Sequence, residues 1–174
     1  MDAFLVFGMP RSRTAWVANF LTTDRSLCLH EGLVDGKGNA LSLHHRMARL
    51  DYPVVGNADT GMIHQRAELQ RVFPDARLVV LTGATLSWST FARAHCIEPA
   101  LRERIESDYR DTRKALEGKA LEVNVHHMLQ DERCARALWA HCLGAERPFP
   151  HARWRMLRDL NVQVIPESLE RRIF

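Results

Sequence analysis

The sequence predicts an α/β fold, a three-layer sandwich with a mostly parallel central sheet of about five strands. Short apolar runs alternate with segments whose apolar residues have helical spacing. The run at residues 77–81 is continuously apolar after Arg77, as in strands buried on both faces of a parallel sheet. The chain of 174 residues has no internal repeat, low-complexity tract or linker, so we expect a single domain over residues 1–174.

The elements follow one another in a regular order. Strand-like segments are expected at residues 4–7, 27–29, 53–56, 77–81 and 121–125. Helical spacing predicts helices at residues 16–21, 41–50, 64–73, 86–94, 98–116, 132–143 and 151–160. Gly118 and Gly144 are expected helix stops, and a short apolar stretch at 162–165 follows the last helix.

Composition limits the class of protein. Hydrophobic residues make up 46% and charged residues 26%, which is ordinary for a globular domain. No segment approaches the ~20 apolar residues of a membrane span, so no membrane association is predicted. The first residues lack a basic region followed by a long apolar stretch, and we therefore expect no signal peptide.

The four cysteines are scattered and form no Cys-x-x-Cys pair, which favours a reduced, cytoplasmic protein. A zinc site built from Cys134, His141, Cys142 and His151 would have a spacing that matches no common zinc finger, and no metal is expected. The net charge is +3 and the pI is about 8.9. Most arginines lie among acidic residues, so the small excess suits an anionic small ligand, and nucleic acid is not predicted.

Polar residues collect where the expected strands end. In open parallel sheets, ligands bind outside the carboxyl ends of the strands. The segments that follow the five expected strands are Gly8–Thr14, His30-Glu31, Asn57–Thr60, Thr82-Gly83 and His126-His127.

The first of these segments, Gly8-Met9-Pro10-Arg11-Ser12-Arg13-Thr14, has the features of an anion-binding loop. A loop between a buried strand and a helix directs backbone N–H groups, and the positive end of the helix, toward a ligand. Arg11 adds a bidentate cation, and Ser12 and Thr14 add hydroxyl donors. The ATP-binding pattern G-x-x-x-x-G-K-[ST] is not matched, because the Gly-Lys pair is missing and the spacing is one residue short. A kinase or nucleotide hydrolase with a degenerate loop remains an alternative.

Residues 4–21 resemble sulfotransferases, whose loop has the pattern G-x-P-[RK]-[ST]-G-[ST]-[ST]. The residues that match in register are Gly8, Pro10, Arg11, Ser12 and Thr14, while Arg13 replaces the loop glycine and Ala15 the second hydroxyl. The resemblance implies a P-loop NTPase-like fold and a loop, residues 8–14, that holds the phosphosulfate of 3′-phosphoadenosine-5′-phosphosulfate without a metal. It implies transfer of the sulfuryl group to a hydroxyl or amine of a small-molecule or protein acceptor.

A second family site is expected after the strand at 77–81. Aligned at the strand end, Thr82 takes the place of an arginine and Thr90 that of a serine, both of which bind the 3′-phosphate in the family. Arg93, about one helical turn beyond Thr90, is a possible substitute for the arginine. Because the arginine is absent, a non-catalytic binding module that has kept the fold is a third alternative.

Sulfuryl transfer requires alignment, a base and positive charge, as phosphoryl transfer does. Arg11 would supply the charge and Glu31 the base, with His30 as the second choice and Asp59 as the third. Adjacent residues of an extended strand face opposite ways, so we expect only one of His30 and Glu31 to face the site.

Overall fold

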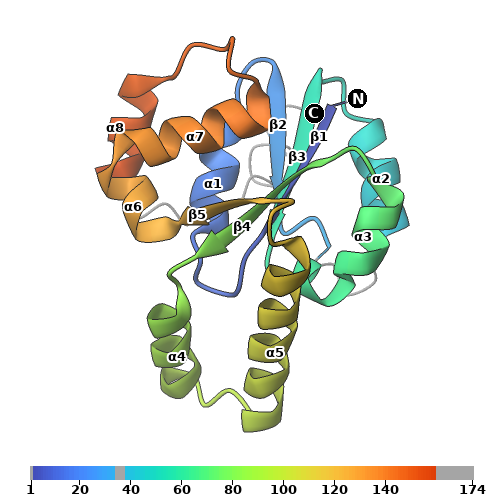
Figure 1. Ribbon diagram of the computed structural model, residues 1–174, viewed down its shortest axis with the longest axis vertical. Helices are drawn as coiled ribbons and strands as arrows, with labels where there is room; N and C mark the ends of the chain where they lie inside the picture. Colours follow the sequence, from blue (N-terminus) through green and yellow to red (C-terminus); the bar gives the residue numbers. More distant parts are fainter. Residues whose placement is uncertain (1, 34–37, 160–174) are drawn as a thin grey trace.

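The computed structural model describes residues 2–33 and 38–159 and has the predicted α/β architecture. Five parallel strands form one sheet in the order β2-β3-β1-β4-β5 (Figure 1). The strands are β1 (Asp2–Phe7), β2 (Ser26–His30), β3 (Val54–Asp59), β4 (Arg77–Thr82) and β5 (Leu121–Asn124).

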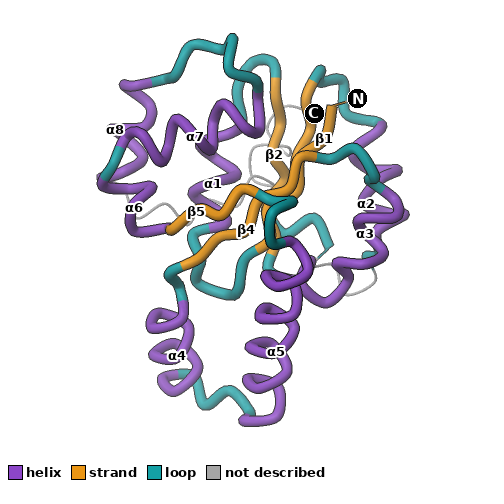
Figure 2. The backbone as a smooth tube through the Cα atoms, in the orientation of Figure 1, coloured by secondary structure: helices purple, strands orange, loops and turns teal. Residues whose placement is uncertain are grey.

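Helices cover both faces of the sheet (Figure 2). One face carries α1 (Thr14–Leu21), α6 (Val125–Gln130), α7 (Glu132–Leu143) and α8 (His151–Asp159). The other carries α2 (Ala40–Ala48), the 3-10 helix η1 (Gly61–Gln65), α3 (Arg66–Val72), α4 (Thr85–Ala94) and α5 (Pro99–Leu116). The chain crosses the sheet in one direction from β1 to β2 and in the other direction in all later connections between strands. Because crossovers between parallel strands are right-handed, α1 lies on one face of the sheet and the helices of the later crossovers lie on the other.

Successive side chains of a strand point to opposite faces of the sheet, so the hydrophobic core has two parts, one on each face. Phe4 and Val6 of β1 point to the α1 side, and Leu5 and Phe7 point to the α2 side. All four side chains are fully buried. Both faces of β1 are therefore covered, and packing on both sides holds its carboxyl end, where the β1–α1 loop begins.

Helices α4 and α5 form a hairpin that extends beyond the carboxyl ends of the strands (Figure 1). The hydroxyl of Tyr109 donates to the carbonyl of Leu81 at 2.8 Å, and that of Thr112 donates to the carbonyl of Ile63 at 3.2 Å. These bonds anchor the second half of α5 against the sheet and η1. Helix α4, the other arm of the hairpin, lies next to the β1–α1 loop.

The structure differs from the sequence expectations in two places that affect the site. Strand β3 continues to Asp59, so Asn57 and Asp59 lie inside the strand instead of in a loop after it. Residues 126 and 127 lie in α6, a helix that begins immediately after β5 because the Asn124 side chain accepts the backbone N–H groups of both histidines. The apolar stretch expected at 162–165 lies outside the described residues.

Candidate functional site

The loop between β1 and α1 contains two arginines in the left-handed region of backbone conformation. Arg11 has φ 71° and Arg13 has φ 65°. For a residue with a Cβ this conformation costs about 1–2 kcal/mol, and such strain is concentrated at ligand sites. Arg13 also caps α1, since its carbonyl accepts the N–H of Val17 at 3.0 Å. Arginine thus adopts a conformation that glycine favours at the position where the resembling loops carry glycine.

Ser12 lies inside the curve of the loop. It is fully buried, and its backbone N–H donates to the carbonyl of Met9 at 3.1 Å. A Cβ placed on Gly8 would lie only 2.1 Å from the Ser12 hydroxyl oxygen, so glycine at position 8 makes room for that hydroxyl. Within the described residues this oxygen has no hydrogen-bond partner.

A cavity of about 450 Å³ opens beside this loop at the carboxyl ends of β1, β2 and β3. Its wall combines cationic, hydroxyl, imidazole, carboxylate and aromatic groups from four parts of the chain. The lining residues are Pro10, Arg11, Arg13, Thr14, Ala15, His30, Glu31, Thr60, Ser87 and Phe91. The lining includes two guanidinium groups and one carboxylate, and this excess of positive charge favours an anionic ligand.

His30 and Glu31 both line this cavity, which corrects the expectation that only one of them would. The alternation of an extended strand ends at His30, because Glu31 has φ 54°. Nε2 of His30 lies 3.8 Å from Oε1 of Glu31 and 3.1 Å from the hydroxyl of Thr14. The His30 side chain is 9% exposed and that of Glu31 is 38% exposed. The same imidazole nitrogen therefore lies near both the Thr14 hydroxyl of the loop and the Glu31 carboxylate.

Helix α4 forms the opposite wall. The guanidinium carbon of Arg11 lies 5.2 Å from the centre of the Phe91 ring, within cation–π range. Ser87, one helical turn earlier, lines the cavity from the same helix. Sequence reasoning did not find Phe91. The available signal was its four-residue spacing from Ser87, in the helix that follows the strand beside β1.

Several predicted site residues do not line the cavity. Gly8 and Ser12 shape the loop without lining the cavity, and Thr82 and Thr90 do not line it either. Thr90 and Arg93 are exposed on α4. Asp59 is fully buried, and its carboxylate accepts the backbone N–H groups of Leu33 and Gly61 at 2.8 and 2.6 Å. Its carboxylate oxygens are therefore occupied by the backbone, so it is a poor candidate for the base.

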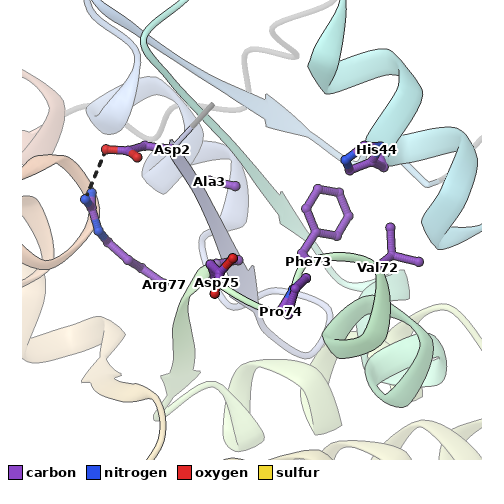
Figure 3. A pocket seen from close by; sticks show the side chains of 9 residues that line it. Asp2, Ala3, His44, Val72, Phe73, Pro74, Asp75 and Arg77 are labelled. Carbon is purple, nitrogen blue, oxygen red and sulfur yellow. Dashed lines mark hydrogen bonds and ion pairs between the residues drawn. The ribbon is translucent and has the colours of Figure 1, made fainter.

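A second, smaller cavity of about 190 Å³ lies at the amino ends of β1 and β4 (Figure 3). Three of its polar side chains contact neighbouring groups. Arg77 forms an ion pair with Asp2 at 3.3 Å, and the ring of His44 lies 5.2 Å from that of Phe73. This cavity lies at the amino ends of the strands, whereas the β1–α1 loop lies at their carboxyl ends. It is smaller than the cavity beside the loop, and its lining includes no cluster of cations.

Within residues 2–33 and 38–159, the structure shows no group of three or more histidine, cysteine, aspartate or glutamate side chains placed to hold a metal ion. The same residues include no helix with both the length and the apolar character needed to cross a membrane. Neither a protein-family model nor a curated protein sequence matches the chain.

Proposed function

We propose that the protein is a sulfotransferase-like enzyme that transfers a sulfuryl group from 3′-phosphoadenosine-5′-phosphosulfate to a hydroxyl or amine. The observation that carries this proposal is the shared cavity. An anion-binding wall (Arg11, Arg13, Thr14) and a histidine–glutamate pair face the same space of about 450 Å³. Group transfer to an acceptor needs both an anion clamp and a base within reach of it.

The donor set fits a phosphosulfate. Guanidinium groups present N–H donors in a fork that matches phosphate and sulfate oxygens, and the Thr14 hydroxyl adds a donor at the first residue of α1. When bound, such a donor supplies the sulfuryl group: sulfur gains a bond to the acceptor atom as its bond to the bridging oxygen breaks. Arg11 and Arg13 would stabilise the negative charge that this separation leaves behind.

Glu31 would take the acceptor's proton, because its carboxylate is the more exposed member of the pair. His30 is nearly buried between Thr14 and Glu31 and would orient both. This division of roles keeps Glu31 as the base and makes His30 the link between the base and the loop.

Thermal unfolding with 3′-phosphoadenosine-5′-phosphate tests the donor, in parallel with ATP in the presence and absence of magnesium. A ligand at about 100 times its Kd should add about 2.7 kcal/mol to the free energy of unfolding. We expect this stabilisation with the bisphosphate, independent of magnesium. A magnesium-dependent shift with ATP alone would instead indicate the kinase or nucleotide hydrolase, and no shift with either ligand would leave the non-catalytic binding module.

The Arg11→Ala variant should lose the bisphosphate shift, because it removes the cation that lies over the cavity. Arg25→Ala is the matched control, since Arg25 is an exposed arginine that does not line the cavity. Equal shifts in both variants would remove the loop from the proposed site.

A further inference from the structure

The side-by-side placement of His30 and Glu31 in one cavity needs an explanation, because neighbouring residues at a strand end ordinarily point apart. The structural cause is the left-handed conformation of Glu31, with φ 54°. This conformation is unfavourable for glutamate, so contacts elsewhere must hold the turn in place.

Those contacts come from the last three residues of β3. The carbonyl of Ala58 accepts the N–H of Glu31 at 3.1 Å. The side-chain oxygen of Asn57 accepts the N–H of Gly32 at 3.0 Å, and the carboxylate of Asp59 accepts that of Leu33 at 2.8 Å. Three consecutive N–H groups of the turn are therefore bound by three consecutive residues of the neighbouring strand.

The two side chains of this clamp are themselves immobilised. Asn57 and Asp59 are fully buried. The second carboxylate oxygen of Asp59 accepts the N–H of Gly61, and the Asn57 amide donates to the sulfur of Met62 at 3.3 Å. Both are thus tied to η1 on their other side, and neither can turn away from the 31–33 segment without breaking a buried hydrogen bond.

Gly32 completes the fit. A Cβ on Gly32 would lie 2.6 Å from the side-chain oxygen of Asn57, so the turn can approach β3 this closely only with glycine at position 32. We infer that Asn57 and Asp59 are positioning residues, whose hydrogen bonds to the 31–33 turn hold Glu31 in the left-handed conformation and so direct it into the same cavity as His30. The inference rests on the proposed function, because it assigns Glu31 to the reaction.

The test compares Asp59→Asn with the matched control Asp51→Asn, which makes the same change at an exposed aspartate remote from the cavity. Asp59→Asn keeps the shape of the side chain but loses an acceptor. We expect it to lower kcat for sulfuryl transfer at least about tenfold, with the KM for the donor unchanged, because the β1–α1 loop holds the donor and the clamp does not.

A second background separates positioning from general loss of structure. In Glu31→Gln, where the base is already absent, Asp59→Asn should cause no further loss of kcat. An equal loss of kcat in both backgrounds overturns the inference, and so does a higher donor KM with kcat unchanged.

A readout without activity distinguishes failure of this inference from failure of the proposed function. Glu31→Gly should raise the Tm of the otherwise wild-type protein, because glycine relieves the left-handed backbone, and should raise it less in Asp59→Asn, where the turn relaxes. If no sulfuryl transfer is found, this difference alone decides whether the clamp exists. Equal gains in Tm in the two backgrounds overturn it.

Discussion

Individual residues of the loop show how a strained backbone and a charged side chain are combined. Arg13 keeps a left-handed conformation, with φ 65° and ψ 28°, and also lines the cavity. A glycine there would adopt this conformation readily but would add no charge. The backbone cost of about 1–2 kcal/mol is therefore tolerated at a position where the side chain lines the cavity.

Two substitutions at this position separate strain from charge. Arg13→Gly should raise the free energy of unfolding by about 1 kcal/mol, because it removes the Cβ that makes φ > 0 unfavourable. Arg13→Ala should give no such gain, and both variants should weaken binding of 3′-phosphoadenosine-5′-phosphate. Chemical denaturation measures the first effect and calorimetric titration the second. If both variants bind like the wild type, Arg13 is not a ligand.

At the scale of secondary-structure elements, helix α4 is the wall that faces the loop across the cavity. It is placed there by the hairpin with α5, whose second half is bound to β4 and η1 through Tyr109 and Thr112. Phe91 then lies within 5.2 Å of the Arg11 guanidinium. The helix therefore supplies an aromatic surface that holds a flexible cation over the cavity.

Substitution of Phe91 tests this contribution. A cation–π contact is worth about 0.5–1 kcal/mol at an exposed site and ~2 kcal/mol or more when desolvated. Phe91→Leu, which keeps an apolar side chain without the aromatic face, should therefore raise the Kd for the bisphosphate about two- to thirtyfold. Ser87→Ala is the companion change on the same wall and should have the smaller effect. Unchanged binding by Phe91→Leu would show that the ring does not hold Arg11.

The molecule as a whole buries ionisable thiols in the core that α1, α6, α7 and α8 form on one face of the sheet. Cys28 and Cys142 are fully buried there. Burial raises the pKa of both thiols well above the ordinary value of 9.0. The folded state thus keeps these protons at a pH where the unfolded chain releases them.

Alkaline pH should therefore destabilise the protein through this core. A group with a raised folded-state pKa contributes its full stability below the unfolded pKa and loses it as the pH rises further. Above pH 9.0, the ordinary thiol value, each of the two thiols should lower the free energy of unfolding by about 1.4 kcal/mol per pH unit. Denaturation curves between about pH 8 and 10 measure this slope. The Cys28→Ala/Cys142→Ala variant should show a correspondingly smaller slope, and an equal slope would contradict the assignment.

Most of the fold could be predicted because its signals are local. The continuous apolar run in β4 and the helical spacing in α5 and α7 depend on neighbouring residues only, and the structure confirms all three. The extension of β3 was missed because Asn57 and Asp59 are polar residues of low strand propensity. Their buried side chains bind a turn about 26 residues earlier in the chain, a contact that no local pattern indicates.

The candidate site could be predicted in part for the same reason. The loop and the two neighbouring strand-end residues follow from the motif and from the carboxyl-end rule for parallel sheets. That His30 and Glu31 share a cavity depends on a left-handed residue, and no pattern of single residues indicates it at a glutamate. The contact between Arg11 and Phe91 joins residues about 80 positions apart, and only the packed hairpin determines it.

The tight fit of Ser12 against Gly8 has a consequence for how this loop can vary in evolution. An alanine at position 8 would place its methyl group 2.1 Å from the hydroxyl oxygen and 3.2 Å from the Cβ of Ser12. The two positions therefore share one small volume, and a methyl group at position 8 requires the Ser12 hydroxyl to leave its place inside the loop. Homologous loops should covary at this pair, with a hydroxyl held inside the loop at the second position where the first is glycine.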